Sequence, residues 1–209
     1  MARLTIICMV LLTAAFSGTQ NLFAQENTAR SERVDRARSR GKEITMRAFG
    51  TLSSNLMQAV SRGGVSNALE FCSLNAASLT KSAANTNLIE VRRVSHKARN
   101  PGNKANAAEL AVLKQFRSGL ASGKAPTPVI QTGADGSATY FAPIALNNPL
   151  CLNCHGQPGS EIKKEKENLA VIKRLYPKDE ATGFKLGELR GMWRIDFKPS
   201  ALADEDDSN

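Results

Sequence analysis

The chain has 209 residues, of which 42% are hydrophobic and 22% charged. This is the composition of a globular protein, and it excludes collagen-like, low-complexity and fully disordered chains. Four cysteines are too few for a disulfide-stapled scaffold, and two histidines exclude most histidine-rich metal sites. The formal charge of +9 raises the question of an anionic partner such as nucleic acid, a membrane surface or an acidic cofactor.

Residues 1–24 have the pattern of a signal peptide. Arg3 precedes an apolar run from Leu4 to Phe16, which is short for a membrane span, and a cleavage site follows at Ala24. We therefore expect export to the periplasm, with an uncleaved membrane anchor as the alternative. The exported chain would keep an odd number of cysteines, namely Cys72, Cys151 and Cys154.

The pattern of the first half predicts helices. Residues 25–43 are polar and highly charged, so we expect a linker or a frayed helix there. Two helical stripes follow, separated by Gly63-Gly64, and the second one places Cys72 on an inward face. The stripes consist of Ile44, Ala48, Phe49, Leu52, Leu56 and Val60, and then of Val65, Leu69, Cys72, Ala76 and Leu79.

Beyond the second helix the sequence alternates between strand and helix signals. Residues 88–94 predict a strand, and the spacing from Leu110 to Leu120 predicts a third helix. The later segments are a hairpin at 127–131 and 138–142, a charged helix at 163–175 and a half-buried strand at 192–197. We expect an α+β fold in which residues 44–200 form one domain, with N-terminal helices packed on an antiparallel sheet. Residues 201–209 predict an acidic mobile tail.

The segment from Cys151 to His155 reads Cys-Leu-Asn-Cys-His, the attachment signature of c-type haem. Two thiols three positions apart can each form a thioether with one vinyl group of the porphyrin. The histidine after the second thiol, His155, is then held beneath the iron as an axial ligand. The alternatives are a thioredoxin-like redox pair, a plain disulfide and half of a zinc site. A redox pair normally sits early in a βαβ unit, and a tetrahedral zinc site needs a second ligand pair, for which only Cys72 and His96 remain.

The residues alone do not identify the sixth iron ligand. Its candidates are Cys72, His96, Met46, Met57 and Met192. Cys72 is unpaired and faces inward by periodicity, although a buried free cysteine is often only a small apolar side chain. His96 is surrounded by charged residues and is expected to face solvent.

The chain resembles a family of bacterial c-type haem proteins with a PAS-like fold, long catalogued as a haem-binding domain of unknown function. The resemblance implies a cysteine–histidine axial pair, which maps onto Cys72 and His155. His96, at a usually apolar position, supplies a competing ligand, and Phe184 stands where tyrosine is common. Met192 and Trp193 stand where members of the family have smaller residues. The matching segments are 68–72, 91–95, 99–103, 140–144, 151–156 and 181–191.

A basic segment contains Arg92, Arg93, Lys97 and Arg99. Because arginine pairs well with carboxylates, Arg92, Arg93 and Arg99 are candidate contacts for haem propionates, with a solvated charged face as the alternative. Nucleic acid is not expected, because no aromatic platform is interleaved with the charge. An unknown acidic redox or signalling protein fits better, and a membrane fits only if the signal peptide is uncleaved.

These features predict an exported protein that binds one covalent haem c and acts as a redox-responsive sensor through Cys/His ligation. The alternative role is that of a periplasmic electron carrier. An enzyme such as a peroxidase is not expected, because bound Cys72 would block the open iron position that peroxide chemistry needs.

Overall fold

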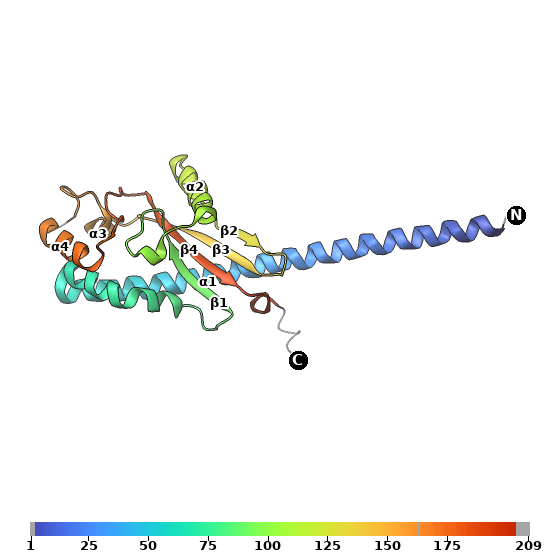
Figure 1. The fold of residues 1–209 in the computed structure, drawn as a ribbon, viewed down its shortest axis with the longest axis horizontal. Helices are drawn as coiled ribbons and strands as arrows, with labels where there is room; N and C mark the ends of the chain where they lie inside the picture. Colours follow the sequence, from blue (N-terminus) through green and yellow to red (C-terminus); the bar gives the residue numbers. More distant parts are fainter. Residues whose placement is uncertain (1–2, 163, 204–209) are drawn as a thin grey trace.

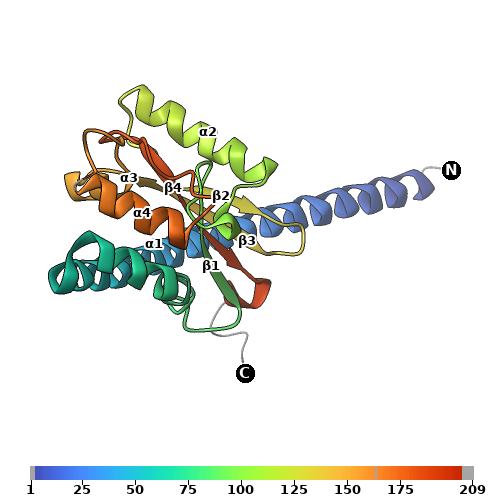
Figure 2. The same ribbon diagram turned by 60° about the vertical axis from the view of Figure 1, so that its left-hand side comes forward.

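The computed structural model describes residues 3–162 and 164–203, with side chains from residue 24 onward. Its first element is the long helix α1 (Arg3–Lys81), which has non-helical backbone at Gly63 and Gly64. Gly64 has φ of +72°, a left-handed conformation that glycine adopts at little cost. The chain reverses direction there, so the two parts of α1 lie side by side (Figures 1 and 2). The break predicted at these glycines is confirmed.

The predicted signal peptide falls, from Arg3 onward, in the part of α1 that projects away from the sheet (Figure 1). Among the described residues, no helix is both long enough and apolar enough to cross a membrane. Ala201 and Leu202, assigned to the mobile tail, are instead buried in the core, where apolar side chains gain by packing. The acidic residues of that tail begin at Asp204 and lie outside the described residues.

Of the two alternatives for residues 25–43, a linker or a frayed helix, the structure has a helix, because these residues continue α1 without interruption. Ala37 and Gly41, one helical turn apart, are both buried, and a Cβ on Gly41 would lie 2.4 Å from Cγ of Tyr140. Arg36 Nε donates to the carbonyl of Leu202 at 2.8 Å, which ties this segment to the C-terminal end of the fold. A highly charged segment can pack in this way because two small residues are enough to bring a helix close to its neighbours, while most of its charged residues face outward.

A four-stranded antiparallel sheet in the order β1-β4-β3-β2 packs against α1. β2 and β3 form the predicted hairpin, with Gly136 at φ of +83° in its turn. In β4 the alternation is as predicted, since Trp193, Ile195 and Phe197 are buried in the core beneath α1. The strands are β1 (Ile89–Val94), β2 (Val129–Thr132), β3 (Ala138–Ala145) and β4 (Leu189–Phe197).

The helix α2 (Ala107–Ala121) covers the opposite face of the sheet and matches the predicted third helix (Figure 2). It begins with a reciprocal cap, in which Asn106 Oδ1 accepts from the Glu109 backbone and Glu109 Oε2 accepts from the Asn106 backbone. Three residues of the predicted apolar stripes are exposed instead, namely Phe49 and Leu56 on α1 and Leu110 on α2. Each helix touches the sheet along a narrow stripe, so apolar residues beside that stripe remain outside.

The remaining elements connect these layers. The charged helix predicted near residues 163–175 is α4 (Glu165–Leu175), and it contacts the second part of α1. There, Ser66 Oγ donates to Oδ1 of the buried Asn168 at 2.8 Å. The short helical turns are η1 (Pro101–Asn103), η2 (Pro149–Cys151), α3 (Leu152–His155) and η3 (Pro199–Ala201). The predicted α+β fold is confirmed as a long helix packed on a four-stranded antiparallel sheet.

Candidate functional site

The C-x-x-C-H segment lies in a short helical loop between β3 and α4, where η2 runs directly into α3. Gly156 ends this helix, and its N–H donates to the carbonyl of Leu152 at 2.9 Å. A Cβ at Gly156 would lie 2.7 Å from that carbonyl and from Cβ of Glu161, so the position has room only for glycine. The loop therefore holds both thiols and the imidazole within little more than one helical turn.

The imidazole of His155 is oriented through its Nδ1 atom. Nδ1 lies 2.8 Å from the carbonyl oxygen of Ala181 and 3.3 Å from Nε of Arg190. A carbonyl can only accept and a guanidinium can only donate, so one nitrogen cannot serve both, and the shorter contact assigns the proton to Nδ1. Nε2 then keeps its lone pair free for a metal, in the arrangement typical of histidine ligands.

The electrostatics keep His155 neutral. Burial, assisted by the nearby cations of Arg190 and Arg99, lowers the pKa of His155 well below its usual range. A neutral imidazole is the form that binds metals. The backbone of His155 is held as well, because the Phe184 N–H donates to the His155 carbonyl at 2.9 Å.

Cys72, Cys151 and Cys154 are all free and partly buried. Burial, together with the charges of Cys72 and Cys151 and against the opposing charge of Arg99, raises the pKa of Cys154 to about 11. The charge of Cys72, which belongs to the second part of α1, thus acts on a thiol of the C-x-x-C loop. Burial also raises the pKa of Cys72, against the opposing effect of Arg93 and Arg99. The unliganded side chains of Cys72 and Cys154 are therefore thiols at neutral pH.

Three arginines surround these groups. Arg99 pairs with Asp179 at 3.0 Å and donates to the carbonyl of Cys154 at 2.7 Å, and both members of the pair are mostly buried. Arg190 donates to Ser95 Oγ at 2.8 Å, and burial, with the cations of Arg99 and Arg93, lowers its pKa to about 9. Arg190 therefore remains charged at neutral pH.

Of the charges that act on Arg190 among the described residues, Arg93 and Arg99 are cations and only Asp179 is an anion. Three buried or half-buried cations thus share one carboxylate. This positive excess is costly in a protein interior unless an anionic group joins it.

Other candidates from the sequence lie elsewhere. Arg92 precedes Arg93 on β1 and points to the opposite face of the sheet, because side chains alternate along a strand. Its guanidinium reaches the carbonyl of Gly102 at 3.4 Å. Met46 and Met57 are exposed on α1, and Met192 is fully buried in the core beneath α2.

His96 does not face solvent as expected. Its Nδ1 atom is buried and has no hydrogen-bond partner within the described residues, and burial lowers its pKa. Its ring packs edge-on against Phe184 at 5.9 Å, and His155 packs against the same ring at 6.3 Å. Phe184 thus contacts both imidazoles, and the local sequence around His96 gave no signal of this long-range contact.

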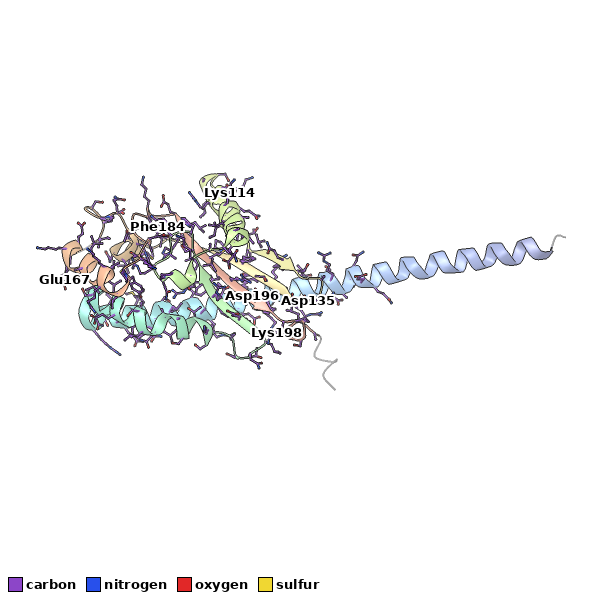
Figure 3. The ribbon with its side chains drawn as sticks, viewed as in Figure 1. Lys114, Asp135, Glu167, Phe184, Asp196 and Lys198 are labelled. Carbon is purple, nitrogen blue, oxygen red and sulfur yellow. The ribbon has the colours of Figure 1, made fainter. Side chains whose placement is uncertain are left out.

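The alternative chemistries find less support. No group of three or more His, Cys, Asp or Glu side chains within residues 3–162 and 164–203 could hold a metal ion. A surface cavity of about 410 Å³ is lined by Asp135, Asp196 and Lys198, among others. These three residues lie at the other end of the sheet from Phe184 (Figure 3). The thiol cluster and this cavity are therefore separate features.

The comparison with protein families gives a match over residues 13–197 to the family described as Tll0287-like. The chain belongs to the Tll0287-like family. Its structure is similar to the crystal structure of the cyanobacterial heme-protein Tll0287, with a TM-score of 0.54 and 29% sequence identity. That similarity covers 76% of this chain and 93% of the other. No curated protein matches the chain. The resemblance expected from the sequence is confirmed.

Within this Tll0287-like chain, two site residues were not predicted. Arg190 stands inside the matching segment 181–191, but periodicity assigns it no role. Asp179 stands just before that segment. Both become visible only where β4 and the loop after α4 meet the C-x-x-C-H turn.

Proposed function

We propose that the protein binds one haem c, attached covalently through Cys151 and Cys154, with His155 as an axial ligand. The observation that carries this proposal is the hydrogen bond from His155 Nδ1 to the carbonyl of Ala181, directly after the two thiols of the C-x-x-C loop. It leaves Nε2 unprotonated and fixes the direction of the ring, as an iron ligand requires.

The charges around the loop fit the same group. Haem carries two carboxylates, and Arg93, Arg99 and Arg190 form a cation excess that only Asp179 offsets among the charges acting on Arg190. We propose Arg93 and Arg190 as the contacts for the propionates, with Arg99 engaged mainly by Asp179. Arg92 takes no part, because it lies on the other face of β1.

For the sixth position we propose Cys72. It is the thiol that the loop itself does not use, and its charge acts on Cys154, so it lies within range of the same centre. His96 is the competing ligand; its ring contacts Phe184, and burial with the charges of Arg117, Arg190 and Lys97 lowers its pKa.

The bound haem would supply a one-electron redox centre. Cys72 then holds two protonation states, a thiolate when it serves as a ligand and a thiol when it is released, since burial raises its pKa in the free form. Because Cys72 belongs to the second part of α1, its release can change how that helix packs. We therefore propose a redox-responsive sensor, with the helices and sheet as a PAS-like scaffold.

The proposal also covers the location of the protein in the cell and its partners. We propose export to the periplasm through residues 1–24 and a separate redox or signalling protein as partner, with membrane association only if that segment is retained. Neither nucleic-acid binding nor an enzymatic reaction is proposed. The alternative role is electron transfer between partners, for which no conformational change is needed.

Haem attachment is tested by the intact mass of the protein matured in a host that attaches haem c. One covalent haem is expected, and it should stay with the chain in acidified acetone. Cys154→Ala should lose one thioether bond, whereas Cys8→Ala, in the predicted signal peptide, should retain both. A wild-type protein without covalent haem would refute the attachment.

The ligand and the role are tested by variants and by hydrogen exchange. Cys72→Ala should change the ferric absorption spectrum and raise the reduction potential, whereas His96→Phe should change neither. The reverse pattern would assign the sixth position to His96. A sensor should show different exchange in the second part of α1 between the two oxidation states, and identical exchange would favour a carrier.

A further inference from the structure

The outer face of the first part of α1 carries an apolar stripe that no other part of the described chain covers. Met46 is 64% exposed, Phe49 61% and Met57 50%, although these side chains lie on a well-packed helix. Large exposed apolar groups gathered on one face mark interaction surfaces. No charged residue occurs from residue 48 to residue 61 in a chain that is 22% charged.

The stripe has the spacing of a helix–helix seam. Met46, Gly50, Ser53 and Met57 follow one another at intervals of four, three and four residues, which keeps them on one face in the manner of a heptad. A Cβ added to Gly50 would have no neighbour within 4 Å, so the centre of this face is open. Ser53 Oγ already donates to the Gly50 carbonyl at 3.2 Å, so its burial would leave no donor unsatisfied.

The order of large and small side chains is the same when it is read in either direction. In an antiparallel pair centred between residues 50 and 53, Met46 of one copy faces Met57 of the other, and Gly50 faces Ser53. The small residues at the centre allow the two backbones to approach closely, and the methionines at both ends adapt to fill the space. A surface that is complementary to itself in this way is what a two-fold dimer requires.

We propose that this stripe, consisting of Met46, Phe49, Gly50, Ser53 and Met57, is a homodimer interface in which the α1 helices of two copies pack antiparallel. The distribution of charge favours a second copy of this chain as the partner that covers the stripe. Each copy carries +9, so a contact between copies must avoid charged residues, whereas an anionic protein would be drawn to basic residues that the stripe lacks. A membrane-surface helix needs a basic polar face, but the opposite side of α1 is buried against the sheet.

The expected dimer is of moderate affinity. The seam from Met46 to Met57 is about 17 Å long, which gives an interface at the small end for specific association. We therefore expect dissociation on the order of micromolar concentration. Exchange between monomer and dimer should then be visible over a practical concentration range.

The test is the molar mass of the purified, haem-loaded protein in detergent-free buffer, measured by light scattering and sedimentation over a range of concentrations. The wild type should reach twice the chain mass, and Met57→Glu should weaken the dimer by roughly 10- to 100-fold. Leu110→Glu is the matched control, since it places the same charge on an equally exposed apolar site of α2 on the other side of the sheet. It should leave the dimer unchanged.

The antiparallel arrangement has its own test. A chain carrying both Met46→Lys and Met57→Glu places Lys opposite Glu at each end of the seam, so it should dimerise more tightly than Met57→Glu alone. A wild type that stays monomeric at all concentrations would overturn the proposal, as would a dimer insensitive to Met57→Glu. A monomer that binds anionic phospholipid vesicles through this stripe would overturn it in favour of a membrane surface.

Discussion

Asp179 is expected to be the residue whose charge matters most for the stability of the site. Its carboxylate pairs with Arg99 at 3.0 Å, and the exposed fractions of the two side chains are only 8% and 11%. The change Asp179→Asn keeps the size of the side chain and an oxygen that can still accept from the Ala181 N–H. It therefore removes the negative charge while it disturbs the packing very little.

The expected loss of unfolding free energy follows from the burial of this ion pair. Removing one partner of a buried ion pair leaves the other charge uncompensated and typically costs about 3–5 kcal/mol. The charge of Asp179 also acts on Arg190, so Asp179→Asn leaves Arg99 and Arg190 without this compensation, in the field of Arg93 as well. Because both side chains keep some exposure, we expect the low end, about 3 kcal/mol, which corresponds to a decrease in Tm of roughly 6–12 °C.

The assay is urea and thermal unfolding of the haem-loaded protein, followed by circular dichroism. Glu180→Gln is the matched control, because Glu180 is the next residue and pairs with Lys104 on the surface, where both side chains are about half exposed. That change should cost less than about 0.5 kcal/mol. Adding Arg99→Met to Asp179→Asn should restore part of the lost stability. If Asp179→Asn and Glu180→Gln have equal effects, the reasoning from a buried cation cluster is wrong.

Three further outcomes are expected. Phe184→Ala should destabilise the fold by about 3 kcal/mol in urea and alter the absorption spectrum, because its buried ring supports His155; an unchanged spectrum would show that the ring is not needed there. In protein produced without haem, the raised pKa of Cys154, about 11 against 9.0 in the unfolded chain, favours the protonated thiol in the fold. Stability should therefore be complete below pH 9 and fall by roughly 2 kcal/mol towards pH 11, and this fall should be smaller in Cys154→Ala. Gly41→Ala should cost about 1–3 kcal/mol, because a Cβ there would overlap the Tyr140 ring, whereas Ser39→Ala on the exposed side of α1 should change stability very little.

Several features could be predicted because their causes are local. The C-x-x-C-H segment needs only five adjacent residues, and the break in α1 needs only the two glycines that disrupt a helix there. The alternation in β4 follows from the pleat of a single strand. In each case the physical reason acts within a few residues, so periodicity and spacing were sufficient.

The tertiary structure decided which distant residues share the site. Arg92 and Arg93 are indistinguishable by composition, but the pairing of β1 with β4 turns only Arg93 toward the thiols. Arg190 and Asp179 acquire their roles from contacts with α3 and Arg99, which lie far away in the sequence. His96 was expected in solvent because its neighbours are charged, yet its ring is held against Phe184 by the fold.

The sequence by itself therefore predicted the proposed chemistry of attachment and determined the order of helices and strands. It also showed the family through segments spread from residue 68 to residue 191. Only the tertiary structure decided the surroundings of His155, the cation excess around it and the apolar face of α1 that stays open to solvent. The physical reason is that burial and electrostatic interaction depend on distances in space, and a helix or strand pattern does not specify which neighbouring element will cover each face.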